Sequence, residues 1–317
     1  MKFELSVPAT LSNFGPGFDT LGMALNRYLK IKFEADESIK SNELIIEEGE
    51  YSHNVPAAEI NMIYKAAEKY CKRNFRLKIK NDIPLKRGLG SSSAANAVTF
   101  VLKELLTHEE LLKNDSHSLI ETIRPRIYND AIKSEGHPDN ITPCLFGGFV
   151  TARIANGEGS FLNLPFPESL KLHVLIPDIE VETKLAREIL PKSYSLKDVT
   201  SNLQNLSFMM AEFCLNSKIP EKLPIFMNLK NLLADRVHQD YRLELCRPCG
   251  EVIKMLNNSE KIYGAFLSGS GTTICAVAPE DAEFEIKKAL HLFEAQNIGV
   301  KYYIHNIEYS GLKIKIL

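Results

Sequence analysis

The run PLKRGLGSSSAAN at residues 84–96 places the strongest constraint on how this chain can fold. It gathers glycine, serine and alanine between an alternating apolar–polar segment at 75–85 and an apolar segment with helical spacing at 92–106. A flexible linker would have polar, unstructured flanks, whereas these flanks predict a strand and a helix. The order strand, glycine loop and helix start favours an anion site over a tight turn, because glycines reach positive φ and the first helical N–H groups lack partners.

The two commonest phosphate-binding signatures do not fit this run. A P-loop requires GxxxxGK[ST], and neither its lysine nor its spacing is present. A dinucleotide fingerprint requires GxGxxG, but Gly88 and Gly90 are followed by Ser93 at the third position. A phosphate loop here therefore has to be of another kind.

Length and composition describe an ordinary folded protein. The chain has 317 residues, 44% hydrophobic and 25% charged, enough for one large domain or two of medium size. A net charge of −2 gives no overall attraction to nucleic acid or to an anionic membrane, so neither is expected as a partner. The N-terminus lacks the apolar core of a signal peptide and no apolar run reaches 18 residues, so a cytoplasmic location is expected.

The six cysteines are scattered, and we expect free thiols in a reducing compartment. Cys246 and Cys249 form a lone CxxC, which without a second ligand pair is weak ground for a metal or redox site.

Strand patterns and helix patterns occur in clusters along the chain, which favours an α+β fold over regular β–α alternation. A domain border is expected near 150–165. Strands are predicted at 3–10, 23–35, 42–50, 75–85, 149–155, 171–177, 264–269, 272–279 and 300–309, and helices at 61–73, 92–106, 183–190, 201–215, 230–238, 249–257 and 281–296.

Three motifs in order carry a family resemblance. The glycine run resembles the phosphate-binding motif of GHMP kinases (galactokinase, homoserine, mevalonate and phosphomevalonate kinases), and GAFLSGSGTTICAVAP at 264–279 resembles their third glycine motif. VPATLSNFGPGFDTLGMAL at 7–25 is most similar to the homoserine kinases within that superfamily. Further agreement comes from HPDN at 137–140, EVETKLAREILP at 180–191 and DRVHQDYR at 235–242.

The resemblance implies a fold and an activity. The fold is α+β with two domains, a ribosomal protein S5 domain 2-like ATP-binding domain over 1–160 and a ferredoxin-like domain over 161–317. The activity is phosphorylation of L-homoserine by ATP with Mg²⁺, in threonine biosynthesis; homodimers are common in such families. A GHMP kinase for another small hydroxyl compound, such as threonine or shikimate, and a non-catalytic ligand-binding homologue are the alternatives.

The resemblance also assigns roles to residues at the phosphate end. Ser92 matches a serine whose hydroxyl reaches Mg²⁺, although it could instead cap the helix. Such kinases hold Mg²⁺ with a Glu eight residues before the His of HxDN, and here that position is Asn129. Either Asp130 replaces it, or Mg²⁺ relies on ATP, Ser92 and water, or activity is altered. The ATP-binding residues implied are Pro84, Lys86, Arg87, Gly88, Leu89, Gly90, Ser91, Ser92, Ser93 and Ala94.

At the substrate end, the resemblance assigns Arg187 and Arg242 to the homoserine carboxylate, for which Arg is a bidentate donor. Taken alone, both would be read as surface residues. Asp19 would meet the ammonium, although a lone Asp in a turn more often forms an Asx-turn. The residues expected to contact substrate are Asn13, Asp19, His137, Arg187 and Arg242, and those near the reacting hydroxyl are Asn140, Thr183 and Arg187.

No side chain is expected to be an essential base, because a loose phosphoryl-transfer transition state needs alignment more than early proton removal. Ser268–Gly271 is either a plain turn between two strands or, by resemblance, part of the active-site floor near the glycine loop.

Overall fold

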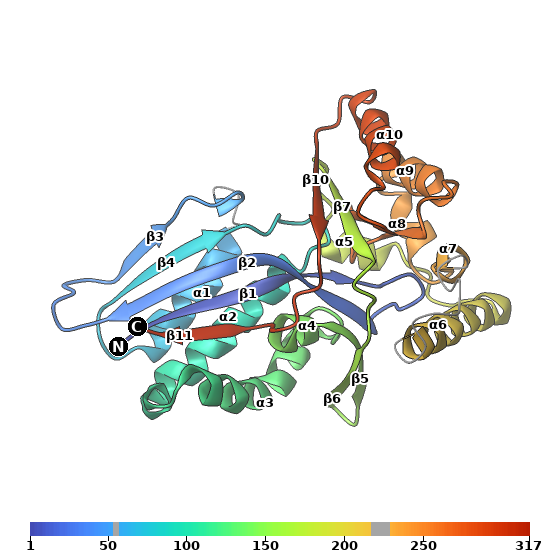
Figure 1. The fold of residues 1–317 in the computed structure, drawn as a ribbon. Coiled ribbons are helices and arrows are strands. Elements are labelled where there is room, and N and C mark those ends of the chain that lie inside the picture. Colours follow the sequence, from blue (N-terminus) through green and yellow to red (C-terminus); the bar gives the residue numbers. More distant parts are fainter. Residues whose placement is uncertain (53–56, 217–228) are drawn as a thin grey trace.

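The computed structural model describes residues 1–52, 57–216 and 229–317, which build two sheets with helices packed against them (Figure 1). The larger sheet has the strand order β11-β1-β2-β4-β3, and β5 and β6 extend it by pairing of β5 with β2. Its strands are β1 (Lys2–Ser12), β2 (Leu21–Ala35), β3 (Glu43–Ile46), β4 (Phe75–Asn81), β5 (Phe149–Ala155), β6 (Glu158–Leu164) and β11 (Lys313–Ile316).

Four helices cover one face of this sheet, with α2 central among them and in contact with β1 (Figure 1). They are α1 (Ala57–Tyr70), α2 (Ser91–Thr107), α3 (Ser116–Glu135) and α4 (Ile141–Phe146), and a 3-10 turn (Glu109–Lys113) links α2 to α3. The predicted alternating strand and small-residue helix are confirmed as β4 and α2. Alternate residues of β4 are buried, and the buried side of α2 begins with Ser93 and the two alanines that follow it.

The smaller sheet is antiparallel, in the order β10-β7-β9-β8. Its strands are β7 (Lys171–Pro177), β8 (Gly264–Leu267), β9 (Ile274–Ala278) and β10 (Val300–His305). Helices α9 (Arg247–Asn257) and α10 (Glu283–Glu294) pack on it. The same half holds α5 (Thr183–Glu188), α6 (Leu196–Asn216), α7 (Leu229–Leu232) and α8 (Gln239–Leu243).

Two sheets with clustered strands and helices confirm the predicted α+β class. The last strand, β11, pairs with β1, so the two chain ends lie side by side in the larger sheet (Figure 1). A division of the chain at 160/161 stays a prediction, and β6 of the larger sheet ends at Leu164.

Some elements differ from those predicted. The patterns did not reveal α3, α4, α8, β6 or β11. Helix α3 has many polar residues and contains Pro125. The predicted helix at 230–238 is helical only at its start, in α7, and is wrong beyond Leu232. The Asp235 carboxylate accepts the backbone N–H groups of His238 and Gln239 at 2.7 Å each and turns the chain between α7 and α8.

Cys246 and Cys249 form a disulfide, so the expectation of free thiols is wrong for this pair. Within the described ranges, no helix has both the length and the apolar character needed to cross a bilayer.

Candidate active site

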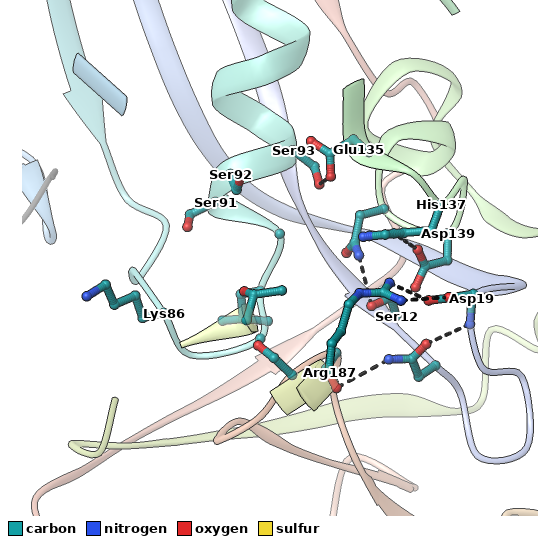
Figure 2. A pocket seen from close by; sticks show the side chains of 18 of the residues that line it. Ser12, Asp19, Lys86, Ser91, Ser92, Ser93, Glu135, His137, Asp139 and Arg187 are labelled. Atoms are coloured by element: carbon teal, nitrogen blue, oxygen red, sulfur yellow. Dashed lines mark hydrogen bonds and ion pairs between the residues drawn. The ribbon is translucent and has the colours of Figure 1, made fainter. Parts of the chain in front are cut away.

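A cavity of about 360 Å³ lies between the two halves of the chain, where the glycine loop meets segments from both (Figure 2). The N-terminal half contributes the end of β1, the start of α2 and the turn between α3 and α4. The C-terminal half contributes α5, α8 and the turn between β8 and β9. The cavity therefore brings together all the sequence motifs that point to phosphate or amino-acid binding.

The glycine loop requires glycine at two positions for steric reasons. Gly88 and Gly90 have φ of +74° and +68°. A Cβ on Gly88 would lie 2.1 Å from the Ser268 carbonyl oxygen, and one on Gly90 would lie 2.0 Å from Thr10 Oγ1. Gly90 is the N-cap of α2 and no side chain caps the helix, so the alternative of Ser92 as a helix cap is wrong. The first α2 amides remain free of side-chain caps, as an anion site requires.

The third glycine motif lies against this loop. Ser268 Oγ donates to the Gly88 carbonyl at 2.6 Å, and Gly269 and Ser270 line the cavity. Ser268–Gly271 was expected to be either a plain turn or part of the floor of the site. It is the turn between β8 and β9, and Gly269 and Ser270 in it form part of the cavity wall.

Most residues expected to bind ATP line the cavity, but three do not. Arg87 is buried: its Nε donates to the Pro177 carbonyl at 3.1 Å, and its Nη2 pairs with Asp178 at the end of β7. It therefore ties the loop to the smaller sheet, which corrects its assignment as a nucleotide contact. The predicted ATP-binding residues that line the cavity are Lys86, Gly88, Leu89, Gly90, Ser91, Ser92 and Ser93; those that do not are Pro84, Arg87 and Ala94.

Charged side chains gather at the other end of the cavity (Figure 2). Arg187 binds Asp19 through both terminal nitrogens, at 2.8 and 3.1 Å. Asn13 Oδ1 accepts the Asp19 N–H at 2.9 Å, and Asn13 Nδ2 donates to the Gly269 carbonyl at 3.2 Å. Asp19 therefore pairs with Arg187 rather than forming an Asx-turn.

Arg242 also lines the cavity near this pair and is buried, whereas most arginines are exposed. Its Nε donates to the Ala186 carbonyl at 3.1 Å and its Nη1 to the Gly269 carbonyl at 2.7 Å. Burial, with the neighbouring Arg187 charge, lowers the pKa of Arg242 to about 10. Arg242 remains a cation at neutral pH, held in place by two backbone carbonyls.

The HPDN segment adds an oriented histidine and an oriented amide. His137 Nδ1 donates to Asp139 at 2.5 Å; burial opposes ionisation, but this hydrogen bond and charge leave the pKa of His137 raised. Asn140 Nδ2 donates to Ser12 at 3.0 Å, and its Oδ1 accepts from Thr10 at 2.7 Å. Both groups line the cavity with fixed orientation.

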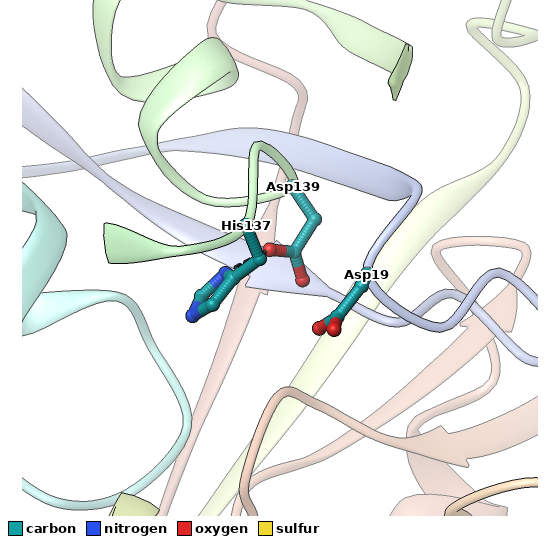
Figure 3. Close-up of side chains that lie close together, drawn as sticks. All are labelled: Asp19, His137 and Asp139. Carbon is teal, nitrogen blue, oxygen red and sulfur yellow. Dashed lines mark hydrogen bonds and ion pairs between the residues drawn. The ribbon is translucent and has the colours of Figure 1, made fainter. Parts of the chain in front are cut away.

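Asp19, His137 and Asp139 have ligand atoms within 4.8 Å of one another, a spacing that suits a metal ion (Figure 3). Arg187 already holds both oxygens of Asp19, and His137 is bonded to Asp139. The negative charge of this cluster is thus balanced by protein cations, so the cluster fits an amino-acid site better than a metal site.

Comparison with known proteins shows the family to which this chain belongs. Residues 61–148 match the model of the GHMP kinases N terminal domain, and residues 217–294 match that of the GHMP kinases C terminal domain. The homoserine kinase of Aquifex aeolicus is 32% identical over 95% of this chain and 99% of its own length. That of Aliarcobacter butzleri is 31% identical over 99% and 100%. The chain belongs to the homoserine kinase family of the GHMP kinases.

Solved structures agree on the fold. A homoserine kinase from Cytophaga hutchinsonii has a TM-score of 0.77 at 26% identity, over 99% of this chain and 97% of that one. A putative homoserine kinase from Listeria monocytogenes has a TM-score of 0.71 at 25% identity, over 98% of both chains. A mevalonate kinase from L. major, at 13% identity and a TM-score of 0.64, shares the fold alone. The two-domain GHMP kinase fold expected from the motifs is confirmed.

Of the two carboxylates in the second half of α3, Glu135 lines the cavity and Asp130 does not. Asp130 does not line the cavity; its carboxylate lies 3.6 Å from Lys103 Nζ and is half-exposed. Asn129 accepts the Gly159 N–H on β6 instead. Glu135 ends α3 and lines the cavity.

The prediction sought this carboxylate eight residues before His137, at Asn129 or the neighbouring Asp130, but that spacing does not reach the cavity in this chain. Gly136, with φ +82°, ends α3 directly before the histidine, so the connecting turn is short. Glu135 is held by Ser93 Oγ at 2.7 Å and Asn96 Nδ2 at 3.0 Å. The sequence did carry a signal, an acidic residue directly before a C-cap glycine and the HPDN motif.

A second carboxylate that sequence reasoning missed is Glu59 on α1, which also lines the cavity. Ser91 Oγ donates to it at 3.5 Å. Burial raises the pKa of Glu59 to about 7, and the Glu135 charge contributes to the rise. An acidic side chain beside an anion loop is unexpected, and no sequence motif marked it.

Proposed function

We propose that this protein transfers the γ-phosphoryl group of ATP to the side-chain hydroxyl of L-homoserine, giving O-phospho-L-homoserine, a step in threonine biosynthesis. The observation that carries the proposal is the pairing of one anion site with one zwitterion site in a single cavity. The glycine loop and α2 start suit phosphates. Asp19, Arg187 and Arg242 suit an ammonium and a carboxylate on one small molecule.

The zwitterion enters by exchange of ion pairs. Asp19 and Arg187 are partners of each other without substrate. The substrate ammonium replaces Arg187 at Asp19, and the substrate carboxylate replaces Asp19 at Arg187, so total charge pairing is kept. Arg242 adds a buried cation whose Nη2 makes no hydrogen bond to another described residue. Asn13 and His137 complete the polar surroundings.

At the reacting centre, alignment supplies the catalysis. Asn140, Thr183 and Arg187 all line the cavity, and Asn140 Oδ1 lies close to Gly90 of the glycine loop. We expect these three side chains to contact the reacting hydroxyl. Asn140 is fixed by Ser12 and Thr10, so its amide can orient a hydroxyl but cannot remove its proton. No side chain acts as an essential base; a pH–rate profile with a steep acidic limb caused by a protein carboxylate would contradict this.

The donor set at the phosphate end fits Mg²⁺. Glu135 offers a carboxylate and Ser92 a hydroxyl at the α2 start, the hard oxygen ligands that Mg²⁺ prefers beside phosphate oxygens. Bound there with ATP, Mg²⁺ would neutralise phosphate charge. Ser93 and Asn96 hold the Glu135 carboxylate in place for that role.

Two alternatives make different demands on these residues. A GHMP kinase for mevalonate or shikimate would leave Asp19 without an ammonium to meet. The non-catalytic alternative rested on Asn129, and a carboxylate at Glu135 in the cavity removes that argument. The cytoplasmic location, the homodimer and the absence of nucleic-acid and membrane partners remain predictions.

The test is the initial rate of ADP release by purified protein with ATP, Mg²⁺ and L-homoserine. L-threonine, shikimate and mevalonate are assayed in parallel at equal concentration. We expect turnover on L-homoserine to exceed that on each other compound by at least about tenfold, as a site built for both charges of the zwitterion requires. Faster turnover on mevalonate or shikimate would favour the other kinases, and none on any compound would contradict the enzyme.

A further inference from the structure

Phe18, in the turn between β1 and β2, contacts both guanidinium groups of the substrate end. The Arg242 guanidinium carbon lies 5.2 Å from the centre of its ring, and that of Arg187 lies 5.7 Å from it. Both distances fall within the range where a cation is attracted to an aromatic face. Phe18 directly precedes Asp19, so one short segment holds the carboxylate and the ring that meet the two arginines.

The imidazole of His238 stacks against the ring of Phe18. The two rings stack with centres 5.3 Å apart and planes at 24°. His238 is fully buried, and burial lowers its pKa, so the imidazole is neutral at physiological pH. Its Nε2 donates to the Gly15 carbonyl at 3.2 Å. Asp235 holds the His238 backbone N–H at 2.7 Å. The ring of Phe18 thus stacks on a neutral imidazole whose position is fixed by hydrogen bonds.

The two arginines present a physical problem that this ring addresses. They repel each other: burial lowers the pKa of Arg242, and the Arg187 charge lowers it further. Arg242 is fixed by two carbonyls, but the polar partner of Arg187 in the cavity is Asp19. When the substrate ammonium takes Asp19, Arg187 loses that partner. The face of Phe18 remains in contact with it.

We infer that Phe18, supported by His238, is a positioning residue that holds Arg187 beside Arg242 as a two-pronged clamp for the substrate carboxylate. The inference rests on the proposed phosphorylation of L-homoserine. An aliphatic residue would fill the same space, but it would offer no attraction to either cation. The aromatic ring should therefore affect affinity for the amino acid while leaving nucleotide binding unchanged.

The test compares Phe18→Leu and Phe18→Tyr with the unaltered protein by steady-state kinetics. We expect Phe18→Leu to raise the KM for L-homoserine about tenfold, from the loss of two cation–ring contacts, with kcat and the KM for ATP within about twofold. Phe18→Tyr keeps the ring and should restore the KM. Phe208→Leu, on the exposed face of α6, is the control and should change no constant.

Each outcome has a meaning. Unchanged constants, an equal rise in both KM values, or a fall in kcat alone would each overturn the positioning role. Should Phe18→Leu be recovered unfolded, Phe18→Met gives the same test, because methionine has about the same volume as leucine but adapts its shape more easily. Absence of L-homoserine turnover in the unaltered protein would overturn the proposed function itself, whereas normal turnover with an unaffected Phe18→Leu overturns only this inference.

Discussion

The two ends of the cavity are built in different ways (Figure 2). The loop at the phosphate end is built of backbone and small side chains, with the positive φ of Gly88 and Gly90 and a helix start without a side-chain cap, and Glu59 and Glu135 lie beside it. The amino-acid end consists of long charged side chains that already pair, Asp19 with Arg187 and His137 with Asp139. The glycine loop depends mainly on steric room for its backbone, and the amino-acid end depends mainly on paired charges.

This difference determines how each end fails. At the phosphate end, a methyl group added to Gly88 or Gly90 would overlap a neighbouring oxygen, so the loop backbone would have to shift. At the amino-acid end, removing one charge leaves its partner unpaired, a loss that is large but confined to one substrate. Substitutions at the two ends should therefore differ in size and in which KM they change.

The largest effect is expected from Gly90→Ala. The new Cβ would lie 2.0 Å from Thr10 Oγ1, so the loop must shift, and we expect kcat/KM to fall at least about 100-fold. Gly157→Ala is the matched control, because Gly157 has a similar φ of +79° with nothing within 4 Å of the added Cβ. It should cost about 1 kcal/mol of stability and no activity. Equal losses in both variants would mean that backbone strain, not space, matters.

Asp19→Asn should have the next largest effect. Loss of one charge-assisted pair costs about 1.5–3 kcal/mol, which corresponds to a 10- to 100-fold fall in kcat/KM for L-homoserine. The KM for ATP should stay within about twofold. Asp240→Asn, which removes an exposed carboxylate 3.7 Å from Arg236, is the control with no expected effect. A fall in ATP affinity in Asp19→Asn would show that the two ends are not separable.

Glu135→Gln distinguishes the carboxylate of the cavity from the one first predicted. We expect the Mg²⁺ concentration for half-maximal rate to rise about tenfold, because a neutral amide is a poorer Mg²⁺ ligand. Asp130→Asn, on the outer side of α3 beside Lys103, should leave it unchanged. The reverse pattern would restore Asp130 as the ligand.

Glu59→Gln should give the smallest effect, on stability. The pKa of Glu59 is raised to about 7, so the folded protein keeps this proton where the unfolded chain loses it. The resulting stabilisation is full below about pH 4.5 and is lost as the pH rises through 7. Gln resembles the protonated form, so the variant should melt about 2–4 °C above the unaltered protein at pH 8 and equally at pH 4.5. If the variant and the unaltered protein had the same melting temperature at pH 8 as well as at pH 4.5, the raised pKa of Glu59 would be contradicted.

Sequence reasoning succeeded where the pattern was local and periodic. The strand, glycine loop and helix at 75–107 follow from alternation, glycine and small residues, and the structure confirms them as β4 and α2. It failed for α3, where polar residues and Pro125 interrupt a helically spaced apolar set (Leu119, Ile123, Ile127 and Ala131). It also failed for β11, whose pairing with β1 joins the two ends of the chain.

The sequence also did not predict which way individual side chains point. Lys86 and Arg87 are neighbours, yet one lines the cavity and the other is buried against the smaller sheet. Lys86 has φ of +53°, a backbone state that no sequence pattern reports. Glu135 was missed because the assumed spacing to His137 took no account of where α3 ends. The role of a residue beside a turn depends on the backbone conformation of that turn, which the sequence pattern does not report.

The most direct measurement is ³¹P NMR of the purified protein with ATP, Mg²⁺ and L-homoserine. The account predicts a new phosphomonoester resonance that grows in step with ADP and couples to the methylene protons of the substrate. It also predicts that Asp19→Asn slows this growth at low L-homoserine concentration and not at saturation. Inorganic phosphate as the sole product, or no change in the spectrum, would contradict the account.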